Sequence, residues 1–127
     1  MNQPKIGVLI VDDSEFVRNY HSAILRDASF QVITAGDGVE ALEKLFTNRC
    51  DLVLTDINMQ RMDGYEFIRR VRAEKQYQQI PIVIISTDGQ PKHKKKRFEA
   101  GANLYIVKPC SPEVMLETLN MVMHASS

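Results

Sequence analysis

The sequence lacks any long uninterrupted apolar run, although 44% of its 127 residues are hydrophobic. A membrane-spanning helix needs roughly 18 apolar residues in succession, so we expect no membrane insertion. The segment that follows Met1 also lacks the extended apolar core of a secretory signal, because Asp12 and Asp13 interrupt it. Together these absences predict a cytoplasmic protein.

The chain has no excess of either charge, because 16 Lys and Arg residues balance 16 Asp and Glu residues. Proteins that bind nucleic acid or anionic membrane surfaces usually present a clear positive excess. One basic run, at positions 92–97, contains no interleaved aromatic residue and is typical of a solvated helix face. We therefore expect no nucleic-acid partner, although this run could dock an acidic protein surface.

Cysteine and histidine are scarce, with two and three residues respectively. Cys50 lies just before an apolar run at 51–55, and Cys110 lies just after another at 103–107. If both runs are parallel strands, these thiols lie at opposite edges of one sheet. A six-residue strand spans roughly 20 Å, well beyond the ~7 Å limit for bridging two Cα atoms. The pattern predicts free thiols in a reducing compartment.

The three histidines, His21, His93 and His124, share no metal-ligand spacing and no common strand end. We expect them at surface or amphipathic positions rather than in a metal site. A phosphohistidine carrier is disfavoured for the same reason, since that role needs an exposed histidine with supporting neighbours.

Five short apolar segments have the length and composition of buried strands. They occupy residues 6–11, 31–35, 51–56, 80–86 and 103–107. Each is followed by a segment with helical spacing and a helix-start signal: Ser14, Asp37–Gly38, Asp63–Gly64, Gln90–Pro91 and Ser111–Pro112. Strict alternation predicts an α/β fold with one doubly wound parallel sheet, five helices and right-handed crossovers. We expect a single domain over residues 1–127, long enough to bury about two thirds of its unfolded surface.

The last helix should bury a continuous apolar stripe. Its predicted members are Val114, Met115, Leu116, Leu119, Val122 and Met123.

Polar residues gather at the predicted strand ends. Asp12 and Asp13 follow the first strand, Asp56 closes the third, Ser86 the fourth, and Lys108 follows the fifth. The carboxyl ends of parallel strands share one edge of the sheet, where ligands of open α/β folds bind. Crowded carboxylates repel one another, and a hard divalent cation relieves that repulsion. A few protein oxygens completed by waters suit Mg²⁺.

These groups describe a pocket for a phosphoryl group. An ionised aspartate such as Asp56 can itself be the nucleophile and form an aspartyl phosphate without a general base. Phosphoryl transfer spreads negative charge over three equatorial oxygens. Mg²⁺ would neutralise one, Lys108 another, and Ser86 with a backbone N–H the third. This economy favours Asp56 as a phosphoacceptor over a hydrolase.

With these motifs the chain resembles a response-regulator receiver domain over positions 5–124. The resemblance implies a flavodoxin-like sheet with strand order 2-1-3-4-5. It implies that Asp12 and Asp13 are metal-binding acids, that Asp56 is both the phosphoacceptor and a metal ligand, and that the backbone carbonyl of Asn58 binds the same metal.

The resemblance also implies a switch. Ser86 would be the switch hydroxyl, Tyr105 the switch aromatic and Lys108 the phosphate-sensing lysine. The Lys108–Pro109 peptide would be cis, a conformation tolerated essentially only before proline. Phosphorylation of Asp56 would draw Ser86 inward and let Tyr105 fill the space, as a population shift.

Three positions depart from the family pattern. Gln60 stands where the family usually has proline, which predicts a looser loop after the acceptor. Ser86 replaces the commoner threonine, and Thr87 occupies a place often held by alanine. The family resemblance also assigns Asn58 and Asp88 to the control of attacking water. Their small polar side chains predict a short-lived aspartyl phosphate.

The implied function is a receiver in a two-component phosphorelay. It takes a phosphoryl group from the phosphohistidine of a sensor kinase or phosphotransfer protein and switches a protein-binding face made of the fourth helix, fifth strand and fifth helix. The architecture resembles a stand-alone chemotaxis-type regulator, but a receiver cut from a larger regulator or hybrid kinase fits equally. We expect a signalling protein that catalyses only its own phosphorylation and dephosphorylation.

Two other classes stay open. A Mg²⁺-dependent phosphohydrolase could use an aspartate nucleophile, but haloacid-dehalogenase-like enzymes carry Asp-x-Asp, whereas Asp12 and Asp13 are adjacent. A nucleotide- or flavin-binding module would need a phosphate loop rich in Gly or Ser/Thr after the first strand. The acidic segment at 12–15 would repel phosphate there unless a metal intervened.

Overall fold

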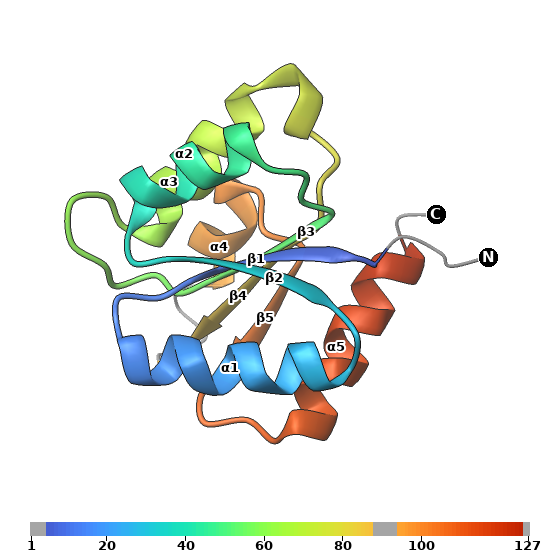
Figure 1. The fold of residues 1–127 in the computed structure, drawn as a ribbon. Coiled ribbons are helices and arrows are strands. Elements are labelled where there is room, and N and C mark those ends of the chain that lie inside the picture. Colours follow the sequence, from blue (N-terminus) through green and yellow to red (C-terminus); the bar gives the residue numbers. More distant parts are fainter. Residues whose placement is uncertain (1–4, 88–93, 126–127) are drawn as a thin grey trace.

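A five-stranded parallel sheet forms the centre of the molecule, as Figure 1 shows for the computed structural model, which describes residues 5–87 and 94–125. The spatial order is β2-β1-β3-β4-β5. This order confirms the predicted fold class. The strands are β1 (Gly7–Val11), β2 (Gln31–Ala35), β3 (Leu52–Thr55), β4 (Ile82–Ser86) and β5 (Leu104–Val107).

A helix follows each strand, as the sequence predicts. The helices are α1 (Glu15–Asp27), α2 (Gly38–Thr47), α3 (Gly64–Ala73), α4 (Lys94–Ala100) and α5 (Pro112–Ala125). Ser14, Asp37 and Asp63 cap the first three, each accepting a hydrogen bond from a backbone N–H of the first turn. A short 3₁₀ helix, η1 (Lys75–Tyr77), was not predicted. The predicted helix start at Gln90–Pro91, together with Asp88 and His93, lies outside the described residues.

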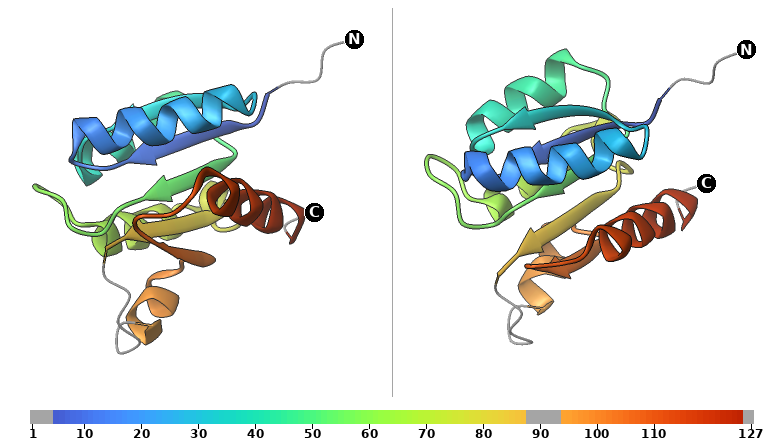
Figure 2. Two further views of the ribbon diagram at one scale, coloured as in Figure 1. Left: turned by 90° about the horizontal axis from the view of Figure 1, so that it is seen from below. Right: turned by 60° about the horizontal axis from the view of Figure 1, so that its bottom comes forward.

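The helices divide between the two faces of the sheet, α1 and α5 on one and α2, α3 and α4 on the other (Figures 1 and 2). Alternation along the strands produces two cores. Val8 and Ile10 of β1 pack with Leu25 of α1 and Leu119 of α5. Leu9 of β1 faces the opposite side, in a cluster that also contains side chains of α2, α3 and α4. A sheet covered on both faces explains why its central strands are apolar throughout.

The predicted stripe of α5 is right at five positions and wrong at one, because Leu116 and Met123 are half-buried and pack against the same core. Met115, Leu119 and Val122 are buried, whereas Val114 is 46% exposed. Positions 115, 119 and 122 share one helical face, and position 114 lies about 100° away from 115 around the helix axis. Val114 therefore points away from the sheet.

His21 is buried, with 4% exposure, so of the two predicted alternatives it takes the amphipathic position and not the surface one. It lies on the side of α1 that faces the sheet, one position after the half-exposed Tyr20. His124 is exposed, as predicted.

Cys50 and Cys110 are both free thiols, as predicted. Burial raises the pKa of Cys50 to about 11, and the nearby Asp51 carboxylate adds to the shift. Within residues 5–87 and 94–125, every helix is too short or too polar to traverse a lipid bilayer.

Candidate functional site

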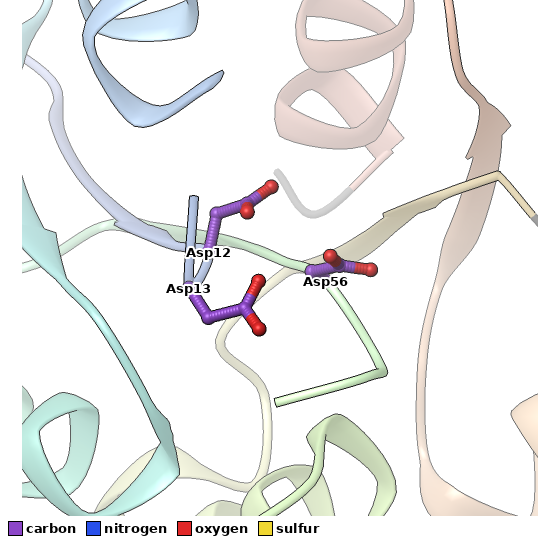
Figure 3. A group of neighbouring side chains, drawn as sticks. All are labelled: Asp12, Asp13 and Asp56. Carbon is purple, nitrogen blue, oxygen red and sulfur yellow. The ribbon is translucent and has the colours of Figure 1, made fainter. Parts of the chain in front are cut away.

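Three carboxylates meet at the carboxyl edge of the sheet. Asp12 and Asp13 follow the last residue of β1, and Asp56 follows the last residue of neighbouring β3 (Figure 3). Each offers an oxygen within 4.8 Å of the other two. Asp12 and Asp56 are buried, whereas Asp13 is exposed. The structure therefore brings together the three acids that the sequence predicted at one edge.

The backbone of this edge is fixed by short hydrogen bonds. The Asp56 amide donates to the Val11 carbonyl at 2.8 Å, which continues the ladder between β3 and β1. The Ile57 amide donates to Asp56 Oδ1 at 2.7 Å. The Ser14 amide donates to Asp12 Oδ1 at 2.9 Å, in an Asx turn that leads into α1. The acids are therefore placed by main-chain contacts rather than by long flexible side chains.

Lys108 enters the cluster from the end of β5. Its Nζ donates to Asp12 Oδ2 at 2.7 Å and to Asp56 Oδ2 at 3.3 Å. The ammonium is largely shielded from water, because 13% of the side chain is exposed. The peptide that follows, Lys108–Pro109, is cis, as the family resemblance implied. Lys108 thus supplies the positive charge that the sequence placed at this edge.

Burial and charge act on the titrating groups in opposite directions. Burial raises the pKa of the Asp56 carboxyl, and the Asp12 charge adds to this, although the Lys108 ammonium and the Ile57 amide act to lower it. Burial works against the Lys108 ammonium, but its contacts with Asp12 and Asp56 raise the pKa of Lys108 overall. Lys108 therefore keeps its positive charge more readily than an ordinary lysine, whereas burial disfavours the negative charge of Asp56.

The donor set fits a magnesium ion. All three acids supply oxygen, which Mg²⁺ prefers, and their spacing allows one ion to be shared among them. The exposed position of Asp13 leaves this side open to water, which Mg²⁺ retains in most protein sites. Asp12, Asp13 and Asp56 are therefore the residues that would hold the ion.

Ser86 and Tyr105 lie on neighbouring strands. Ser86 closes β4 and is fully buried, and its carbonyl accepts a hydrogen bond from the Lys108 amide at 2.8 Å. Tyr105 pairs with Ile84, two residues before Ser86, so the two side chains point to the same face of the sheet. Within the described part of the chain, the buried Tyr105 hydroxyl makes no hydrogen bond.

Helix α4 contacts two tyrosines through its basic residues. The Arg97 guanidinium lies 3.4 Å from the centroid of the Tyr105 ring, and Lys96 Nζ lies 4.7 Å from that of Tyr65. Both distances suit cation–π attraction. Part of the basic run, predicted as a solvated face, therefore packs on aromatic rings, and the sequence offered no signal for these pairs.

The loop after Asp56 carries Asn58, whose side chain is exposed. Gln60 in this loop predicted looseness, yet the structure ties the loop to α2. Arg61 donates to both carboxylate oxygens of Asp37, from Nε at 2.8 Å and from Nη2 at 3.1 Å. This pair was not predicted, because 24 positions separate the two residues along the chain.

Two further residues near the site were missed. Arg18 Nη1 donates to the Asp12 carbonyl at 2.6 Å, which anchors α1 to the end of β1. His21 lines a surface hollow together with Lys108 and Cys110. Positions 14, 18 and 21 are spaced so that they lie on one side of a helix. This spacing was the only sign in the sequence that Arg18 and His21 lie on the same side of α1 as Ser14.

The chain is similar to known proteins along most of its length. The family model described as the response regulator receiver domain matches residues 8–120. The chemotaxis protein CheY1 of Helicobacter pylori is 40% identical over 118 residues, which cover 91% of this chain and 95% of the relative. A chemotaxis protein CheY homolog of Campylobacter jejuni is 38% identical over 122 residues, which cover 94% of each chain.

Solved structures agree with these sequence matches. The chemotaxis response regulator CheY4 of Vibrio cholerae superposes with a TM-score of 0.90 at 41% identity, covering 94% of this chain and 99% of that one.

Proposed function

The chain belongs to the response-regulator receiver family of two-component signalling, and from this premise we propose that Asp56 accepts a phosphoryl group from a phosphohistidine. The observation that supports the proposal is the convergence of three acids and Lys108 at one edge of the sheet. The donor is the phosphohistidine of a sensor kinase or a phosphotransfer protein. Asp12, Asp13, Asp56 and the Asn58 carbonyl would hold Mg²⁺.

In the transfer, an Asp56 carboxylate oxygen attacks phosphorus while the bond from phosphorus to the donor imidazole nitrogen breaks. The electron pair of that bond stays with the imidazole, which takes up a proton, and Asp56 becomes an acyl phosphate. A bound Mg²⁺ supplies Lewis-acid neutralisation of phosphoryl oxygens. Lys108 contacts the attacking carboxylate and can pair with a second oxygen, and the Ser86 hydroxyl can donate to the third.

The raised pKa of Asp56 is consistent with an acceptor. Burial disfavours the negative charge of the Asp56 carboxylate. When one of its oxygens forms an ester-like bond to phosphorus, the carboxylate loses this charge and the protein no longer has to bury it. The new charge lies on the phosphoryl oxygens, beside Lys108. Transfer thus moves negative charge outward from the buried end of β3.

The signal leaves through the face formed by α4, β5 and α5. Phosphorylation draws Ser86 toward the phosphoryl group, Tyr105 moves into the vacated space, and the face changes shape. Its exposed apolar side chains, Phe98 of α4, Val107 of β5 and Val114 of α5, suit a protein partner. The partner limits the shift by its differential affinity for the two states.

We assign the chain to a cytoplasmic, chemotaxis-type regulator that folds as one domain over residues 1–127. Two relatives named as chemotaxis proteins support this assignment. The protein acts as a signalling receiver rather than an enzyme on external substrates, with neither nucleic acid nor membrane as a partner. Exposed Asn58 admits water, so the aspartyl phosphate is short-lived.

The test is incubation with acetyl phosphate and Mg²⁺, followed by intact mass spectrometry. We expect one phosphoryl group on the native protein, none on Asp56→Asn, and none on the native protein in EDTA. Asp27→Asn, which removes an exposed carboxylate at the end of α1, is the matched control and should be modified normally.

A phosphoryl group that persists on Asp56→Asn would overturn the assignment of the acceptor. Steady turnover of a small phosphoester by the native protein would instead favour a phosphohydrolase. An adduct that survives for many hours after acetyl phosphate is removed would contradict the short lifetime.

A further inference from the structure

The loop between β3 and α3 is short, and both of its ends are fixed. The Gly64 amide donates to the Ile57 carbonyl at 2.7 Å, and Asp63 caps α3 by accepting from the Glu66 amide at 2.9 Å. Between these ends lies Asn58, whose carbonyl belongs to the proposed magnesium site. The middle of the loop, residues 58–62, has no strand or helix to hold it.

The middle of this loop adopts a strained backbone. Arg61 has a φ of 64°, in the left-handed region that residues with a side chain rarely adopt. The Met62 amide donates to the Gln60 carbonyl at 2.7 Å, across a three-residue turn centred on Arg61. Turns that combine this bond with a positive φ are rare and strained. Such a conformation persists only where surrounding contacts fix it.

The contacts that fix it come from the N-terminus of α2. Arg61 makes its two charge-assisted hydrogen bonds to Asp37, and bidentate pairs of this kind impose orientation as well as attraction. The Gly38 amide donates to the Met62 carbonyl at 3.3 Å. A Cβ on Gly38 would lie 2.7 Å from Met62 Cβ, so Met62 packs directly against the start of the helix.

Asp37 is itself a rigid anchor. Its Oδ1 accepts from the Glu40 amide at 2.9 Å as the cap of α2, and 16% of its side chain is exposed. Burial alone would raise the pKa of Asp37, but the hydrogen bonds from Arg61 and Glu40 lower it overall. Arg61 therefore pairs with a carboxylate whose position is fixed by the helix that it caps.

We propose that Arg61 and Asp37, here called the loop latch, are positioning residues for the magnesium site. The latch holds the loop that carries Asn58 in the conformation in which its carbonyl can bind the ion. It replaces the stiffness that a proline at position 60 would supply. This inference rests on the proposed function, because it assumes that Asn58 is a metal ligand.

Electrostatics and positioning predict opposite results for Arg61→Gln. Removal of a positive charge, with Asp37 left unpaired, should strengthen Mg²⁺ binding if only charge matters. Loss of the latch should weaken Mg²⁺ binding, because binding must then also offset the conformational entropy that the loop loses when it becomes ordered. We expect a Kd for Mg²⁺ about tenfold higher, at the lower end of the effect of residues that orient metal ligands.

The experiment measures Mg²⁺ affinity by isothermal titration calorimetry and amide hydrogen exchange of residues 57–64 in metal-free protein. Arg61→Gln should raise both Kd and exchange. Arg61→Lys, which keeps the charge but loses the bidentate geometry, should restore only part of the affinity. Asp37→Asn keeps a capping side chain and should match Arg61→Gln, and the double variant should be no weaker than either single variant.

The matched control is Arg49→Gln, which removes the same charge from an exposed pair with Asp51 on the other edge of the sheet. It should leave both Kd and loop exchange unchanged. An Arg61→Gln protein that binds Mg²⁺ as tightly as the native protein, or more tightly, overturns the latch alone. Native protein that binds no Mg²⁺ removes the proposed metal site as well, so the two failures are distinct.

Discussion

Lys108 contacts Asp12 and Asp56, which lie 96 and 52 positions earlier in the chain. Sequence reasoning found all three because each follows an apolar run, and strand ends of a parallel sheet share an edge. It could not find the pair that Arg61 forms with Asp37, because a pair between two loops depends on how those loops lie against each other. It left open whether His21 is exposed, because a single polar residue in an amphipathic helix carries no sign of which face it joins.

The burial of His21 predicts a pH effect. Burial and the Lys108 ammonium lower its pKa below the ordinary 6.5, although Asp12 acts to raise it. The unfolded chain therefore takes up a proton at this position near pH 6.5, whereas the folded protein takes it up only at a lower pH. Proton uptake by the unfolded state alone favours unfolding, so stability is lost as the pH falls below 6.5.

The measurement is the free energy of unfolding by urea between pH 7.5 and pH 5.5 in EDTA. His21→Leu should lose less stability over this interval than the native protein does. The control His124→Gln changes an exposed histidine of α5 and should follow the native curve. Equal slopes for His21→Leu and the native protein would contradict the prediction.

The five strands were predicted well, because burial on both faces of the sheet makes them apolar throughout. The helix starts at Ser14, Asp37 and Asp63 were predicted because capping is local chemistry. The exposure of Val114 was not, since which positions of α5 face the sheet depends on its rotation about its axis. The 3₁₀ helix η1 carries no strong local signal.

The start of α3 leads to a prediction about Gly64. A Cβ on Gly64 would overlap the Asp56 carbonyl and lie 2.8 Å from Ile57 Cα, both backbone atoms. Gly64→Ala must therefore push α3 away from the end of β3 or shift Asp56 itself. We expect a loss of about 1–3 kcal/mol in the free energy of unfolding, together with slower phosphorylation by acetyl phosphate.

Gly36→Ala is the matched control, because its added Cβ would meet only the ends of flexible side chains, Arg18 Nη1 at 3.3 Å and Glu40 Oε1 at 3.8 Å. Urea unfolding and intact mass spectrometry of both variants provide the comparison. If Gly64→Ala were as stable as Gly36→Ala, the close approach of α3 to the Asp56 backbone would not contribute to the free energy of unfolding, and the prediction would be wrong.

At the scale of the molecule, one sheet carries both cores, so we expect the chain to unfold in a single transition. Mg²⁺ that binds only the folded state should raise the transition temperature. At a concentration 100 times the Kd, the gain is about 2.7 kcal/mol. Asp13→Asn should lose most of this gain, because it removes one of the three acids.

Differential scanning calorimetry with Mg²⁺ and with EDTA checks both points. A native transition that does not respond to Mg²⁺ would contradict the metal site, and two separate transitions would contradict the single domain.

The contact of Lys108 with acids from the first and third strands has a consequence for synthesis. A polypeptide still emerging from the ribosome has its aspartates long before it has its ammonium, and the last strand must dock before the two can meet. Incomplete chains that end before position 108 carry the Asp56 carboxylate without its counter-charge. The phosphoryl transfer proposed for Asp56 therefore depends on completion of the last strand.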